Sequence, residues 1–152
     1  MQKLSKLSYL AVCTLFFVIT NLFLSNDLVE KLQNGYQYTN SLLTLNYVEN
    51  TGAAFSILQD ARLLLISLSI IAIILVVLYV IKFVENIKMK SIFFVSLMLA
   101  GIFGNLYERI IYGAVRDYFQ LNSINFPIFN ISDIFINIAV IALIILILIK
   151  KT

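Results

Sequence analysis

The chain has 152 residues, of which 61% are hydrophobic and 12% are charged, and its mean hydropathy is +0.97. A soluble domain of this size cannot hide so much apolar surface, because it must cover itself with polar groups. The charged share is also about half of the roughly 25% usual for soluble domains. The net charge of +3 comes from basic residues scattered beside apolar runs, a pattern typical of membrane proteins. We therefore expect membrane lipid around most of the chain and no nucleic-acid partner.

The side-chain inventory excludes several kinds of catalytic site. The sequence has no histidine, which excludes Ser-His and Cys-His nucleophile pairs and the HExxH zinc site. The one cysteine, Cys13, lies inside an apolar run and cannot form an internal disulfide. A Ser-Lys dyad on the outer side of the membrane would have only Lys31 as its base.

Four uncharged apolar stretches are long enough, or nearly so, to cross a hydrocarbon core that needs about 20 residues. Because unpaired backbone groups are costly in lipid, each stretch is expected to be helical. The first run continues well past Cys13, so we expect a retained helix there and not a cleaved signal peptide. The predicted spans of this single domain, residues 1–152, are 7–24, 63–81, 91–107 and 134–149.

The basic residues predict the orientation of these spans. Seven of the 11 Lys and Arg residues share one side if both termini face the cytoplasm, as the excess of cytoplasmic positive charge requires. These seven are Lys3, Lys6, Lys82, Lys88, Lys90, Lys150 and Lys151. The prediction is a protein with both termini inside and two outer segments, 25–62 and 108–133.

The first outer segment is long for a simple connection. Apolar and polar residues alternate from Tyr38 to Val48, after an Asn34-Gly35 turn, which predicts a small β-sheet lying on the membrane. A short amphipathic stretch at Ala53–Leu58 predicts an interfacial helix. The fold class is therefore an all-α membrane protein with four transmembrane helices, a small outer β-sheet and a short interfacial helix.

Polar residues at spans or span ends are informative, since polar groups are expensive to bury in lipid, and here they form three groups of candidate functional residues on the outer side. The first group, 50–55, reads Asn-Thr-Gly-Ala-Ala-Phe and suits either a structural turn or close backbone approach. In the second, Gly101, Asn105 and Arg109 are spaced four apart and share one helical face. Arg109 is interpreted as either an interfacial anchor or an ion-pair partner of a carboxylate.

The third group, 126–133, reads Phe-Pro-Ile-Phe-Asn-Ile-Ser-Asp and precedes the last span. Asn130 or Ser132 can cap a helix there, and Asp133 in the first turn would favour the positive helix end. Asn130, Asp133 and Asn137 also form one stripe on that helix. Helix capping is therefore a complete alternative explanation for Asp133.

Asp117 and Asp133 are the candidates for paired-carboxyl chemistry. Two carboxyl groups that share one proton across a water molecule can hydrolyse a peptide bond: one accepts the proton of water and the other donates to the carbonyl oxygen. Such a pair titrates as a unit. These two residues lie at the outer ends of the third and fourth spans, each beside asparagines.

The three groups together resemble the lipoprotein signal peptidase family, also called signal peptidase II. Its pattern is N-x-G-A-A-F, then G-N-x-x-D/E-R-x-x-x-G-x-V-x-D, then F-P-x-F-N-x-A/S-D. In this chain the three motifs stand, in that order, at 50–55, 104–117 and 126–133. The resemblance covers nearly the whole chain, including the four-span topology.

The resemblance implies cleavage of diacylglyceryl-modified prolipoproteins just before the lipidated cysteine, in the bacterial inner membrane. Matching positions make Asp117 and Asp133 the catalytic pair, without a metal or another cofactor. The same matching gives a role in shaping the site or holding the substrate backbone to Asn50, Gly52, Asn105, Arg109 and Asn130. We expect a monomer.

One pair of positions departs from the family pattern. The family usually has an Asp and, four residues later, a Lys near the outer end of the first span, whereas this chain has Asn21 and Ser25. Two alternatives to the peptidase remain. One is a small transporter with a polar path, and the other is a catalytically inactive relative that binds lipoproteins.

Overall fold

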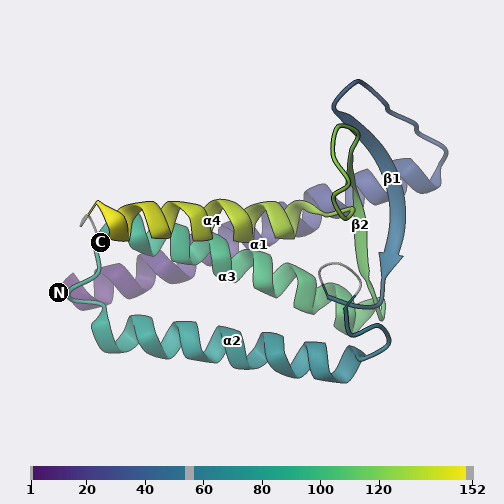
Figure 1. Ribbon diagram of the computed structural model, residues 1–152. Helices are drawn as coiled ribbons and strands as arrows, with labels where there is room; N and C mark the ends of the chain where they lie inside the picture. The colour runs from purple at the N-terminus through teal and green to yellow at the C-terminus, as the bar shows by residue number, and fades with distance from the viewer. Residues whose placement is uncertain (1, 54–56, 150–152) are drawn as a thin grey trace.

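The computed structural model describes residues 2–53 and 57–149. In this part of the chain, four helices lie side by side and a two-stranded sheet stands at one end of the bundle (Figure 1). All four helices are long and apolar enough to cross a membrane, which confirms the predicted fold class of a helical membrane protein with a small sheet. The elements are α1 (Gln2–Gln33), β1 (Leu43–Asn50), α2 (Arg62–Phe83), α3 (Met89–Ile111), β2 (Val115–Leu121) and α4 (Ile131–Leu148).

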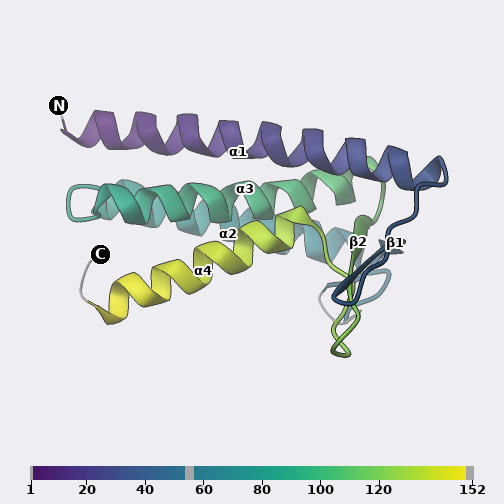
Figure 2. The same cartoon turned by 90° about the horizontal axis from the view of Figure 1, so that it is seen from above.

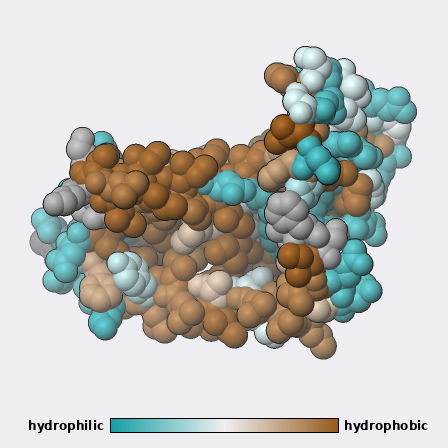
Figure 3. Space-filling model, viewed as in Figure 1, coloured by the Kyte–Doolittle hydropathy of each residue, from teal (hydrophilic) through white to brown (hydrophobic). Residues whose placement is uncertain are grey.

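Helix α3 is the central helix of the bundle, with α1, α2 and α4 packed around it (Figures 1 and 2). Twelve of its residues are buried, against four in α1 and two each in α2 and α4. The outer helices therefore turn most of their apolar side chains outward. Figure 3 shows this surface as a broad hydrophobic band with hydrophilic residues gathered at the two ends, as expected for a bundle surrounded by lipid.

The helices are longer than the apolar stretches that predicted them. The first span was expected to end at residue 24, but α1 continues to Gln33. At 1.5 Å per residue its 32 residues are about 48 Å long, well beyond a hydrocarbon core of about 30 Å. The extra turns carry polar residues that a hydropathy criterion places outside the span, while the helical backbone continues through them.

The sheet is antiparallel and joins two distant parts of the chain. Strand β1 overlaps the second half of the alternation predicted from Tyr38 to Val48 and continues to Asn50. It pairs with β2 in a register that places Asn50 opposite Val115 and Leu43 opposite Leu121. An irregularity between Leu45 and Val48 shifts this register. The pairing brings the end of β1 to the start of β2, beside the end of α3.

The interfacial helix was predicted in the connection between β1 and α2. Half of that stretch, Ala53–Leu58, falls on residues 54–56, which lie outside the described residues. Residues 57–60 form turns, and Leu58 and Asp60 have positive φ angles of 59° and 61°.

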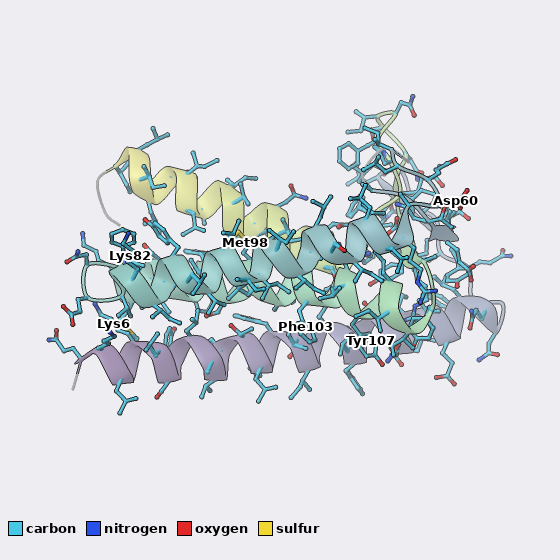
Figure 4. The ribbon with its side chains drawn as sticks, turned by 90° about the horizontal axis from the view of Figure 1, so that it is seen from below. Lys6, Asp60, Lys82, Met98, Phe103 and Tyr107 are labelled. Carbon is cyan, nitrogen blue, oxygen red and sulfur yellow. The ribbon has the colours of Figure 1, made fainter. Side chains whose placement is uncertain are left out.

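The two ends of the bundle differ in charge and construction. Lys6 and Lys82 lie at the end that holds both termini, and Asp60 lies at the sheet end (Figure 4). The ammonium group of Lys6 donates to the carbonyl oxygens of Val84, Glu85 and Ile87 at 3.1, 2.9 and 2.8 Å. A cation is favourable at a helix C-terminus, so this contact fastens α1 to the end of α2.

Candidate active site

Asn130 organises the start of α4. Its side-chain oxygen accepts from the backbone N–H of Asp133 at 3.0 Å, and the Oδ2 of Asp133 accepts from the backbone N–H of Asn130 at 3.2 Å. This reciprocal pair is a capping box. The capping role considered for Asp133 is therefore present, and it fixes the carboxyl group at the first turn of the helix.

Helix α3 supplies the second hydrogen bond to the carboxyl group of Asp133. The side-chain amide of Asn105 donates to its Oδ1 at 2.9 Å. Asn105 also accepts from the side chain of Asn130 at 3.1 Å. Asn105, which belongs to the helical face predicted from the four-residue spacing, therefore contacts the site directly.

Asp117 approaches from β2 and is 3% exposed. Its Oδ2 accepts from the side chain of Asn50 at 3.0 Å, and its Oδ1 accepts from the side chain of Asn130 at 2.9 Å. Burial raises the pKa of Asp117 to about 7; the hydrogen bond from Asn50 opposes this rise and the charge of Asp133 adds to it. The group can therefore hold or release a proton near neutral pH.

One residue connects the two carboxyl groups, which come from different elements. Asn130 donates from its side chain to Asp117 and from its backbone to Asp133. With Asn50 and Asn105, all four carboxylate oxygens have a protein donor, and every donor is neutral. These neutral donors hold the pair in place, and at Asp117 they favour the ionised form against the opposite effect of burial.

The two carboxyl groups face a cavity of about 620 Å³. One wall comes from the end of β1, another from residues 126–129, and a third from Ile136 and Asn137 of α4. The cavity combines apolar walls with the two aspartates, Asn105 and Arg109. Its size and lining suit an extended peptide segment together with a water molecule.

Arg109 fits neither of the two interpretations made from the sequence. Its guanidinium donates to the carbonyl oxygens of Gly52 at 2.9 Å and of Asn105 at 3.2 Å, and the side chain is only 9% exposed. Within the described residues it forms no ion pair. Arg109 therefore ties the turn after β1 to α3, while the N–H of Gly52 donates to the side chain of Asn50 at 2.9 Å.

A buried ion pair that the sequence analysis missed stands behind Asp117. Arg116 contacts Glu108 at 2.6 Å, and a further side-chain bond joins Arg116 to Asn26 of α1 at 2.8 Å. The guanidinium also lies 3.9 Å from the centre of the Tyr112 ring. The sequence did not predict this pair, because its two charges come together only through the turn between α3 and β2.

The predicted site residues come together at the sheet end of the bundle. Asn50, Asn105, Arg109, Asp117 and Asp133 line the cavity, and the hydrogen bonds described above attach Gly52 and Asn130 to them. Among residues 2–53 and 57–149, no cluster of three or more His, Cys, Asp or Glu side chains could hold a metal ion.

Fold and site together define a multi-pass membrane protein with two buried carboxyl groups in a cavity at one end of its helices. The family model described as signal peptidase (SPase) II matches residues 10–149. The chain belongs to the signal peptidase II family, and it is therefore a peptidase. This confirms the family resemblance inferred from the three motifs.

Individual relatives and solved structures agree with this assignment. The chain is 32% identical to a lipoprotein signal peptidase of Streptococcus pneumoniae over 144 residues, covering 93% of this chain and 94% of the relative. It is 38% identical to one of Buchnera aphidicola over 147 residues, covering 91% and 94%. Two bacterial membrane enzyme structures, at 2.3 and 1.9 Å resolution, superpose with TM-scores of 0.77 and 0.75 and identities of 28% and 29%. The alignments cover 93% and 94% of this chain and 88% and 94% of those chains.

Proposed function

We propose that this chain is an aspartic endopeptidase that removes the signal peptide of diacylglyceryl-modified prolipoproteins, cleaving just before the lipidated cysteine. The observation that carries the proposal is the pair Asp117 and Asp133, held by one asparagine and facing one cavity. Family membership supports the same reaction.

The proposed chemistry needs one proton on the pair. The ionised carboxyl accepts a proton from water, the resulting nucleophile attacks the scissile carbonyl carbon, and the protonated carboxyl donates to the carbonyl oxygen. The C–N bond then breaks, and the amine leaves with a proton returned by the pair. The raised pKa of Asp117, about 7, supports a singly protonated pair at neutral pH.

The surroundings of the cavity support a lipidated substrate. A second hollow of about 270 Å³ adjoins the first and shares Asn105 and Arg109 with it. Its remaining lining is mostly apolar and comes largely from α2, with Leu65, Leu68 and Ala72. Acyl chains beside this face would gain roughly 0.8 kcal/mol per buried CH₂ and would hold the scissile bond near the carboxyl pair.

The proposed location is the bacterial inner membrane, with both termini in the cytoplasm and the sheet at the outer face. The lysines of the end that holds the termini support this orientation, since basic residues gather on the cytoplasmic side. A diacylglyceryl group anchored in the outer leaflet would then present the cleavage site at the depth of the carboxyl pair.

The deciding experiment compares Asp117→Asn and Asp133→Asn in single-turnover cleavage of a diacylglyceryl peptide. Each change keeps side-chain size and removes one carboxyl group, so each should abolish turnover. The double variant should lose little more cleavage activity than either single variant, because the effects of groups that act as a unit are not additive. Elution and thermal unfolding in detergent serve as folding controls.

Asp133→Asn separates catalysis from capping. Asn caps helices about as well as Asp, so a residue that only capped α4 would tolerate the change. Near-normal cleavage by a well-folded Asp133→Asn protein would refute the carboxyl pair. The non-lipidated precursor is the substrate control, and cleavage at the same rate as the lipidated one would contradict the lipid-anchored mechanism.

The two alternatives are not favoured. A transporter needs polar groups through the depth of the membrane, whereas the polar residues described above gather at the sheet end and α2 and α4 are strongly apolar. An inactive relative was suggested only by Asn21 and Ser25. Cleavage by the purified wild-type protein distinguishes all three functions.

A further inference from the structure

The outer half of α1 buries two polar side chains. Asn21 is 1% exposed and Ser25 is 5% exposed, one helical turn apart. Burying polar groups at a helix interface in a membrane is costly unless they find hydrogen-bond partners. The partners of Asn21 and Ser25 therefore show what this face of α1 does.

Both residues reach the elements that carry the carboxyl pair. The side-chain amide of Asn21 donates to the hydroxyl of Ser132 in α4 at 2.8 Å. The hydroxyl of Ser25 lies 2.8 Å from the phenol oxygen of Tyr118 in β2 and 3.4 Å from the side-chain oxygen of Asn21. The phenol oxygen accepts from the backbone N–H of Ile131 at 3.2 Å.

These contacts form one chain with a consistent direction. The Ile131 N–H donates to Tyr118, the phenol donates to Ser25, and the Ser25 hydroxyl donates to Asn21. Asn21 then donates to Ser132. The chain starts and ends on adjacent residues of the first turn of α4, directly after Asn130, and every group in it is neutral.

Tyr118 links this chain to the other carboxyl group. It follows Asp117 in β2, it is fully buried, and burial raises the pKa of its phenol to about 12. The phenol thus keeps its proton, and the direction of the chain stays fixed. A shift of Tyr118 would move both Asp117, through the backbone, and the start of α4.

Gly104 of α3 makes room for the contact between α1 and α4. A Cβ atom at this position would collide with the side-chain amide of Asn21 and the hydroxyl of Ser132. The missing side chain is what lets the two polar groups meet across the central helix.

We propose that Asn21, Ser25 and Tyr118 are positioning residues. Their hydrogen bonds clamp the first turn of α4 and so fix Asn130 and Asp133 for catalysis. This inference rests on the proposed peptidase function. It also gives the neutral pair Asn21 and Ser25 a defined role: α1 is fastened to the site through uncharged hydrogen bonds, so this fastening does not titrate.

The first test is a double-mutant cycle on one bond of the chain. Tyr118→Phe and Ser25→Ala each remove one hydroxyl of the pair. Each should lower kcat roughly 10- to 100-fold, the scale expected for misplaced catalytic groups, while KM changes less than twofold. The double variant should lose less kcat than the product of the two single losses, because both changes break the bond between Tyr118 and Ser25. Tyr36→Phe, in the exposed loop after α1, is the matched control and should cleave normally.

The second test does not depend on activity. Hydrogen exchange of the Ile131 amide in detergent should be at least tenfold faster in Tyr118→Phe than in the wild type, because this N–H loses its acceptor. Unchanged exchange, wild-type kcat in either single variant, or additive losses in the double variant would each overturn the clamp. A wild-type protein that cleaves no lipidated precursor would instead refute the proposed function, and the exchange measurement would still decide the clamp.

Discussion

The side-chain amide of Asn130 donates to Asp117 across 2.9 Å, although Asn130 is itself the N-cap of α4. Asn130→Ser separates these two roles. Serine caps about as well as asparagine, but it cannot donate to Asp117 in the same way. We expect kcat to fall by about 100-fold while the thermal midpoint changes little.

The same variant should change the pH profile. A hydrogen bond to an ionised carboxylate lowers its pKa, as the bond from Asn130 does here. Its removal should raise the pKa of Asp117 above about 7, so the alkaline limb of kcat should move to higher pH. An unshifted limb, or a large loss of thermal stability with unchanged kcat, would contradict this assignment.

Asp117 should make the stability of the protein depend on pH. Its pKa is raised from an ordinary value of 3.8 to about 7 in the folded state, so the folded state binds the proton more tightly. Stability should fall as pH rises from about 4 to 7, by on the order of 2–4 kcal/mol, and stay low above pH 7.

Asp117→Asn measures this effect because the amide does not titrate. Relative to the wild type, its thermal midpoint in detergent should rise between pH 5 and pH 8. Asp60→Asn is the control, since Asp60 is exposed and asparagine tolerates its left-handed backbone. A difference between Asp117→Asn and wild type that is independent of pH would refute the raised pKa.

The buried ion pair of Glu108 and Arg116 should be important for folding. Glu108→Gln keeps an acceptor for the backbone N–H of Arg116 but leaves the guanidinium without its counter-charge. Removing one partner of a buried pair typically costs about 3–5 kcal/mol, and the contacts with Asn26 and Tyr112 reduce this somewhat. A lower thermal midpoint is expected, with partial recovery in a Glu108→Gln, Arg116→Met double variant. Equal midpoints for Glu108→Gln and the wild type would show that the pair contributes nothing.

Membrane orientation can be measured with single cysteines in a Cys13→Ser background. Gln37→Cys lies in the loop after α1 at the sheet end, and Lys88→Cys lies in the connection between α2 and α3. An impermeant thiol reagent added outside intact cells or spheroplasts should label the first position only. Labelling of position 37 solely from the cytoplasmic side would reverse the proposed orientation.

The sequence predicted the helices, and it indicated most of the residues that meet in the candidate site, for a clear physical reason. Hydrocarbon forces an apolar stretch into a helix, so the four spans were readable from hydropathy alone. The site residues were readable because their motifs combine glycine, asparagine and aspartate at fixed spacing. The helix ends were less predictable, because α1 continues through the mostly polar segment 25–33.

Contacts between distant segments could not be predicted in the same way. The pairing of β2 with β1 joins residues more than sixty positions apart, and nothing local in the sequence identifies the partner strand. The role of Arg109 depends on the carbonyl of Gly52, a backbone atom that leaves no trace in residue type. The link from Ser25 to Tyr118 likewise depends on how α1 packs against β2.

The length of helix α4 is close to the thickness of a membrane's hydrocarbon core. The helix starts at the capping turn that holds Asp133 and is 18 residues long, about 27 Å at 1.5 Å per residue, close to the roughly 30 Å thickness of a hydrocarbon core. Its length therefore suits a helix that crosses the hydrocarbon core with Asp133 near one end of the span. Under the proposed function, a lipid-anchored substrate would meet the carboxyl pair at a fixed distance from its anchor. Distance along the membrane normal would then select the bond to be cut, and only a short stretch of sequence would have to be recognised.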